Sequence, residues 1–156
     1  MADRVIAVIN QKGGTGKTTL ALNLAAGLAR RAPTAVIDAD PQRSISQWIA
    51  MGGGEHAFPV ATPIGATPAA TIAQLKQSHR YVVVDCPPAV QGPVIDAVMA
   101  AADQVLIPVL PSPLDLWASV EMAALVREAR HKNRAMQAWL VQIGRASCRE
   151  RVLASV

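Results

Sequence analysis

The chain has 156 residues, of which 51% are hydrophobic and 17% are charged, enough for one domain with a substantial core. Its two cysteines are too few for a disulfide framework and lack metal-ligand spacing, and an aromatic content of 3% argues against a base-stacking nucleic-acid platform. No apolar stretch is long enough to span a bilayer and the N-terminus lacks a secretion signal, so we expect a cytoplasmic protein.

The first predicted elements are a strand over residues 4–10, a glycine-rich loop and a helix over residues 18–30. The loop, residues 10–19, reads NQKGGTGKTT. A strand, a glycine-rich loop and a helix in this order are the context of a phosphate-binding loop. Glycines let successive backbone N–H groups turn toward an anion, and the helix N-terminus adds further unpaired N–H groups.

Each part of this loop has an expected task in binding a nucleotide and its magnesium ion. Lys17 would neutralise the outer phosphates, and the hydroxyl of Thr18 would bind Mg²⁺. The backbone N–H groups of the loop would surround the phosphates. The expected nucleotide-binding residues are therefore Lys12, Gly13, Gly14, Thr15, Gly16, Lys17, Thr18 and Thr19.

The loop departs from the general pattern G-x-x-x-x-G-K-[ST] in one place. Gln11 stands where the first glycine is expected, and a second lysine, Lys12, follows it. This arrangement resembles the deviant Walker A motif of the ParA/MinD family of ATPases. The resemblance implies that Lys12 reaches across a dimer interface to the nucleotide of the partner subunit, so that hydrolysis needs an ATP-bound homodimer.

Two later apolar runs are predicted strands that end in carboxylates. Residues 35–37 lead into DADPQ, which starts at Asp38, and residues 81–85 end at Asp85 within DCPP. Unbroken apolar runs suit parallel strands buried on both faces, and such sheets bind ligands at the carboxyl ends of their strands. We therefore expect Asp40 and Asp85 to hold the water molecules around Mg²⁺.

The same two strings resemble the later motifs of the ParA-like family. The resemblance implies that Asp40 orients the attacking water, so that Lys12 and Asp40 are the expected catalytic residues. It also implies that Asp38 supports the metal shell. The alternative is that Asp38 and Asp40 merely cap a turn.

The remaining predicted elements alternate between helix and strand. Such alternation predicts a doubly wound, mainly parallel sheet of the P-loop NTPase type, with helices on both faces. These elements are a helix over 44–51 with Ser44 as its N-cap, an edge strand over 58–61, helices over 67–77 and 94–101, a strand over 104–110, a long helix ending near residue 133 and a strand over 138–143.

Other reactive or aromatic residues have simpler expected roles. Cys86 is expected to be packed, the histidines to lie at the surface and the tryptophans to pack rather than stack on bases. A group of basic residues crowds one end of the long helix, where it suits the helix dipole; a contribution to DNA binding is the alternative. The residues concerned are His56, His79 and His131; Trp48, Trp117 and Trp139; and Arg127, Arg130, Lys132 and Arg134.

Residues 143–156 differ from the rest of the chain. The string IGRASCRERV back-translates to a sequence similar to a widely used sequencing adapter read in frame. We therefore expect an incomplete P-loop ATPase domain over residues 1–142 and an adapter-derived or otherwise non-native tail over residues 143–156. About half of the net charge of +4 belongs to this tail, and a genuine basic tail is the alternative.

The resemblance covers residues 5–141, and the SPLD string before the long helix is similar to the small plasmid partition branch of the family. It implies a partition ATPase with ATP and Mg²⁺ as cofactors. In that function the ATP-bound homodimer binds non-specific DNA and the nucleoid, and a partner protein at the partition site stimulates hydrolysis. No membrane attachment is expected.

Three alternatives stay open. A MinD-like positioning ATPase would need a C-terminal amphipathic membrane helix, and the SPLD string and short N-terminus argue against it. An electron-transfer ATPase would need two cluster-ligating cysteines, and only Cys86 lies outside the expected tail. The third alternative is a nucleotide-binding scaffold without turnover in this truncated form.

Overall fold

The structure, a computed structural model of the chain, describes residues 4–52, 57–65, 67–89, 91–144 and 152–155. Strands and helices alternate through them, close to the predicted positions. The strands are β1 (Arg4–Val8), β2 (Thr34–Asp38), β3 (Val60–Ala61), β4 (Tyr81–Asp85), β5 (Gln104–Val109), β6 (Gln137–Gln142) and β7 (Val152–Ser155). The helices are α1 (Lys17–Ala29), α2 (Ser44–Gly52), α3 (Ala69–Leu75), α4 (Pro93–Ala101) and α5 (Pro113–Lys132).

The strands form one sheet in the order β3-β2-β4-β1-β5-β6-β7. The first six strands are parallel to their neighbours, and β7 pairs antiparallel with β6. The register places Val8, Asp85 and Asp38 side by side at the carboxyl ends of β1, β4 and β2. The phosphate-binding loop therefore leaves β1 beside two carboxylates.

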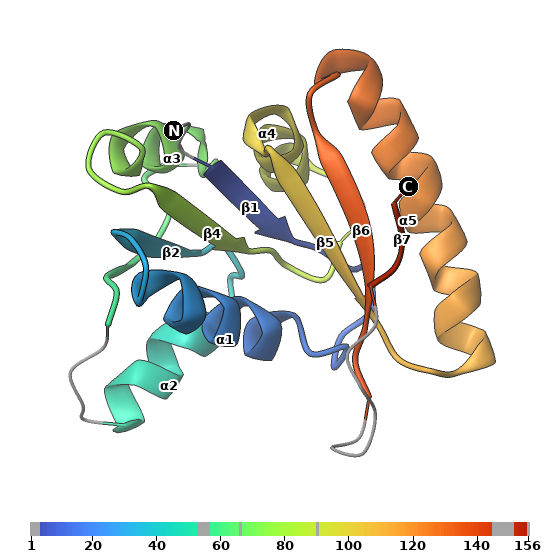
Figure 1. Cartoon of the computed structure of the whole chain (residues 1–156), viewed down its shortest axis with the longest axis horizontal. Helices are drawn as coiled ribbons and strands as arrows, with labels where there is room; N and C mark the ends of the chain where they lie inside the picture. Colours follow the sequence, from blue (N-terminus) through green and yellow to red (C-terminus); the bar gives the residue numbers. More distant parts are fainter. Residues whose placement is uncertain (1–3, 53–56, 66, 90, 145–151, 156) are drawn as a thin grey trace.

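Helices cover both faces of this sheet (Figure 1). Val5, Ala7 and Ile9 belong to the buried cluster that α3, α4 and α5 cover. Val8 points to the opposite face, where it joins the cluster under α1 and α2. Since side chains alternate along a strand, both faces of β1 are apolar because both are covered. The predicted doubly wound fold is confirmed.

The edge strand β7 was not predicted. Its four residues lie within the segment 143–156, and they pair with β6 around Leu140 and Val141. The assignment of this segment to a non-native tail, like the domain boundary at residue 142, stays a prediction.

The prediction that Ser44 caps α2 is wrong. Ser44 is the first helical residue, and the N-cap position belongs to Arg43, whose φ is 51° and whose carbonyl oxygen accepts a hydrogen bond from Gln47 N. The free N–H of Ser46 in the first turn donates instead to Asp38 Oδ2, at 2.9 Å. Asp38 on β2 therefore accepts the hydrogen bond that a serine at the N-cap was expected to accept.

The minor expectations for single residues have mixed outcomes. Cys86 is fully buried, as predicted, and His131 is exposed, whereas His79 is half-buried with its ring beside Ser78 Oγ and Leu75 O. Trp48 is 53% exposed, whereas Ile45 on the same helix is fully buried. Trp139 is half-buried on β6. His56 and the side chain of Trp117 lie outside the described residues.

None of the helices in the described part of the chain combines the length and apolar character needed to cross a bilayer.

The packing of α1 on the sheet leads to a stability prediction. Ala25 is fully buried against the sheet, whereas its neighbour Ala26 is exposed. Ala25→Leu should lower the free energy of unfolding by about 1–3 kcal/mol, because extra methylenes would be forced into a packed layer. Ala26→Leu is the matched control and should change it by less than about 0.5 kcal/mol. Urea denaturation measures both, and equal effects would show that α1 does not pack as described.

Candidate functional site

The loop between β1 and α1 depends on two glycines in a left-handed conformation. Gly14 has φ 74° and Gly16, the N-cap of α1, has φ 83°. Side chains with a Cβ disfavour this conformation, so glycine is required at both positions. The curled loop borders a cavity of about 420 Å³. Its lining residues are Gly13, Gly14, Gly16, Lys17, Thr18, Thr19, Asp40, Gln42, Ser44 and Pro88.

Both backbone groups of Lys12, its N–H and its carbonyl oxygen, are hydrogen-bonded within the loop. Its N–H donates to Asn10 Oδ1 at 3.0 Å, and its carbonyl oxygen accepts from Lys17 Nζ at 3.0 Å and Thr15 Oγ1 at 3.2 Å. The N–H groups that can face a phosphate therefore begin at Gly13. The side chain of Lys12 is exposed and is not among the cavity's described lining residues.

Lys17 is the buried cation of the site. It begins α1 and is only 7% exposed. Burial lowers the pKa of its ammonium group, and the nearby carboxylates of Asp85 and Asp40 oppose that shift. A lysine in a cavity lined by backbone N–H groups is suited to bind a polyanion, which would replace the carbonyl of Lys12 as its partner.

Thr18 joins the loop to the second strand of the site. Its hydroxyl donates to Asp85 Oδ2 at 2.7 Å, although 67 residues separate the two in the chain. Asp85 is 1% exposed, and burial raises the pKa of its carboxyl to about 6, with the Thr18 hydrogen bond opposing and Asp38 reinforcing the shift. The hydrogen bond from Thr18 therefore offsets only part of the free-energy cost of burying the ionised carboxylate of Asp85.

Two carboxylate oxygens in this site are buried without a hydrogen-bond partner. They are Oδ1 of Asp85 and Oδ1 of Asp38, which lie on paired positions of β4 and β2. Unpaired buried oxygens are costly, and a divalent cation with its water shell would supply the missing partner. The donor set of carboxylates and a threonine hydroxyl fits Mg²⁺. The described residues contain no group of three acidic, histidine or cysteine side chains placed to hold a metal ion.

Asp38 and Asp40 also stabilise the local backbone. Asp38 Oδ2 accepts from both the N–H and the hydroxyl of Ser46, which fastens the start of α2. Asp40 Oδ1 accepts from Gln42 N at 2.9 Å, so the turn-capping role considered for these residues is present. Asp40 is nevertheless half-buried and lines the cavity.

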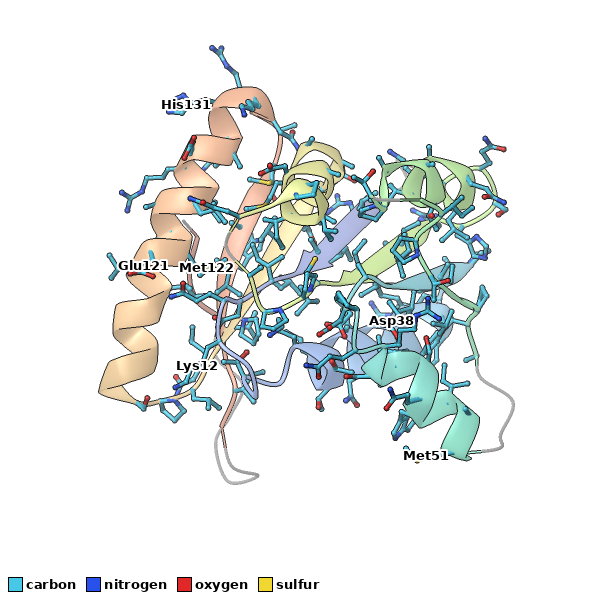
Figure 2. All side chains as sticks on the ribbon, turned by 180° about the vertical axis from the view of Figure 1, so that it is seen from behind. Lys12, Asp38, Met51, Glu121, Met122 and His131 are labelled. Atoms are coloured by element: carbon cyan, nitrogen blue, oxygen red, sulfur yellow. The ribbon has the colours of Figure 1, made fainter. Side chains whose placement is uncertain are left out.

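Most of the predicted loop residues and Asp40 thus line one cavity, and Asp85 is joined to that cavity through its hydrogen bond from Thr18. Lys12, Thr15 and Asp38 are not among the described residues that line it. Figure 2 shows Lys12 on the α5 side of the loop and Asp38 on the α2 side. Sequence reasoning missed Asn10, whose amide holds the loop, and the pairing of Gln11 with Glu121 on α5. In the sequence, only the presence of Gln11 in place of the usual glycine marked this position as unusual. Nothing in the sequence indicated that its partner would be Glu121, 110 residues away.

A parallel sheet with a glycine loop and a buried lysine after its first strand, and with carboxylates at the ends of the next two strands of the sheet, β4 and β2, defines a P-loop nucleotide-binding domain. The sequence profile of the CobQ/CobB/MinD/ParA nucleotide-binding domain matches residues 6–141. The chain therefore belongs to this family, as its resemblance to ParA and MinD proteins predicted.

The chain is similar to proteins named for carboxysome distribution and for chromosome partitioning. The chain is 41% identical, over 138 residues, to maintenance of carboxysome distribution protein A of Halothiobacillus neapolitanus, covering 87% of this chain and 64% of that protein. It is 32% identical to the chromosome-partitioning ATPase Soj of Thermus thermophilus, covering 81% and 63%. The chain therefore spans less than two thirds of the length of these relatives.

A plasmid partition protein of Borrelia burgdorferi bound to AMPPNP has the same fold. The TM-score is 0.72 at 19% identity, with 91% of this chain and 76% of that chain covered. At this identity the likeness supports the fold alone.

The burial of Asp85 leads to a pH prediction for the protein without nucleotide or magnesium. Its carboxyl has a higher pKa when folded, about 6, than its ordinary 3.8. Ionising it therefore destabilises the folded state, and stability falls by up to about 3 kcal/mol between pH 4 and pH 6. Asp85→Asn keeps an acceptor for Thr18 without the charge. It should raise the melting temperature at pH 7.5, and the gain should vanish below pH 4. A gain that persists at low pH would contradict this origin.

Proposed function

We propose that the intact protein is a Mg-ATP-dependent ATPase whose nucleotide cycle positions a cargo. One observation supports the catalytic part: Lys17 and Thr18 line one cavity, and the hydroxyl of Thr18 donates to the strand-end carboxylate of Asp85. Phosphoryl transfer depends mainly on positioning and charge neutralisation, which this set of groups supplies.

Each predicted residue has a task in this proposal. Lys17 and the N–H groups from Gly13 to Thr19 bind the phosphates. The hydroxyl of Thr18 would bind Mg²⁺, and Asp85, Asp40 and Asp38 would hold the water molecules around the ion. Mg²⁺, when bound, neutralises charge on the phosphate oxygens. Asp40, at the cavity wall, orients the attacking water.

Lys12 completes the proposal by acting in trans. Its exposed side chain is not among the described residues that line the cavity beside its own loop, which supports a role toward the nucleotide of a second subunit. Hydrolysis would then require an ATP-bound homodimer. The expected alternative of a scaffold without turnover is tested by the same assay as the catalytic residues.

The relatives point to two candidate cargoes. The similarity to maintenance of carboxysome distribution protein A favours positioning of a carboxysome-like body. Partition of plasmid or chromosomal DNA is the second candidate, supported by the similarity to Soj. Both would use a partner protein on the cargo and non-specific DNA as the track, with the ATP-bound form on the nucleoid.

Two substitutions separate nucleotide binding from turnover. Lys17→Ala should abolish ATP binding, because the phosphates lose their buried cation. Asp40→Ala should preserve ATP binding and dimerisation while lowering turnover by about 10²–10⁴-fold. Fluorescent-nucleotide titration and phosphate release measure the two effects in the intact protein.

Asp96 lies exposed on α4 and offers the matched control, since Asp96→Ala should leave both measurements unchanged. Unchanged affinity in Lys17→Ala would refute the loop assignment. Normal turnover in Asp40→Ala would remove Asp40 from the mechanism.

The basic end of α5 provides the DNA test. Arg127 and Arg130 are exposed near the C-terminal end of this helix. If they contact phosphates, Arg127→Glu with Arg130→Glu should weaken DNA binding and reduce the slope of log affinity against log salt by about 1–2. The same reversal at the exposed Arg30 and Arg31 after α1 is the control. An unaltered salt slope would assign Arg127 and Arg130 to helix stabilisation alone.

A further inference from the structure

The segment that precedes the glycine loop is fastened to the β5–α5 unit at two points. The first is Asn10, which is 3% exposed. Its Nδ2 donates to Pro108 O on β5 at 2.7 Å, and its Oδ1 accepts from Lys12 N. The side chain of Asn10 therefore bridges the central sheet and the backbone of Lys12.

The second point lies one residue further along, where most phosphate-binding loops have glycine. Gln11 Nε2 donates to Glu121 Oε2 on α5 at 2.8 Å. A hydrogen bond to an ionised acceptor is stronger than one between neutral groups. Figure 2 shows that Glu121 and Lys12 lie on the same side of the molecule, one on α5 and the other on the loop.

We propose that Gln11 and Glu121 are positioning residues that aim the side chain of Lys12 from helix α5. The inference rests on the proposed role of Lys12 in hydrolysis. A lysine side chain is long and flexible, so the region that its ammonium group can reach depends on where the backbone places its α-carbon. The hydrogen bond from Lys12 N to Asn10 and the two hydrogen bonds to Lys12 O hold the backbone of Lys12 itself. The Gln11–Glu121 hydrogen bond holds the residue before it.

This arrangement separates positioning from nucleotide binding. The phosphate cradle begins at Gly13 and includes Lys17, whose ammonium group donates to Lys12 O and not to Glu121. Loss of the Gln11–Glu121 hydrogen bond should therefore affect turnover more than ATP affinity. A displacement of about 1 Å at a reacting group can cost up to about 10²-fold in rate.

The test uses the intact protein with Gln11→Ala, Glu121→Ala and the double substitution. Each should lower kcat by about ten-fold, leave ATP affinity within about two-fold, and be no worse in combination, since one hydrogen bond is lost in all three. Hydrogen–deuterium exchange of residues 10–16 in the nucleotide-free protein should become faster. Glu128→Ala, two turns further along the same helix and equally exposed, is the control and should change none of these quantities.

A role exchange provides a rescue. Gln11→Glu alone places two carboxylates together and should lower kcat, whereas Gln11→Glu combined with Glu121→Gln restores an amide–carboxylate pair and should recover it. The inference is overturned if Glu121→Ala retains full kcat while Lys12→Ala is inactive, or if the exchanged pair gives no recovery. If the unaltered protein shows no turnover, the proposed function fails instead, and the exchange rate of residues 10–16 still decides whether the hydrogen bond holds the loop.

Discussion

The hydrogen bond between the Thr18 hydroxyl and Asp85 Oδ2 is the contact on which the site depends. It joins the first turn of α1 to the end of β4, and it can form only because β1 and β4 are parallel neighbours in register. The carboxyl ends of the two strands then open on the same edge of the sheet. The same register places Asp38 opposite Asp85 and thereby connects the start of α2 to the carboxyl end of β4.

Several charged side chains of the site lack a full set of partners, which lowers the free energy of unfolding. Asp38 and Asp85 each have a buried oxygen without a partner, and Lys17 holds a carbonyl oxygen rather than a carboxylate. Buried groups of this kind destabilise a protein unless a ligand completes them. Ligand binding then stabilises the folded state by mass action. The doubly covered sheet supplies the stability that allows such an arrangement, because both faces of β1 are packed.

Local patterns in the sequence were sufficient to predict the fold and to predict which residues gather at the carboxyl ends of β1, β2 and β4. The apolar runs that become β1, β2 and β4 end at the loop and at the two carboxylates, so the parallel order alone brings Lys17, Asp40 and Asp85 together. Contacts made by polar side chains between distant segments could not be predicted this way. Asp38 was expected near a metal, yet it also caps α2 in place of Ser44. The pairing of Gln11 with Glu121 has no periodic signal, since it depends on where α5 crosses the loop.

The burial of Cys86 gives the molecule an internal indicator of local opening. Its thiol lies at 0% exposure one residue after Asp85, and burial raises the pKa of that thiol. A thiol reagent can reach it only when the end of β4 separates from its neighbours, because the reagent needs both access and the thiolate. The rate at which Cys86 is modified therefore measures how often this strand end detaches, and a bound ligand that bridges β1 and β4 would slow that rate.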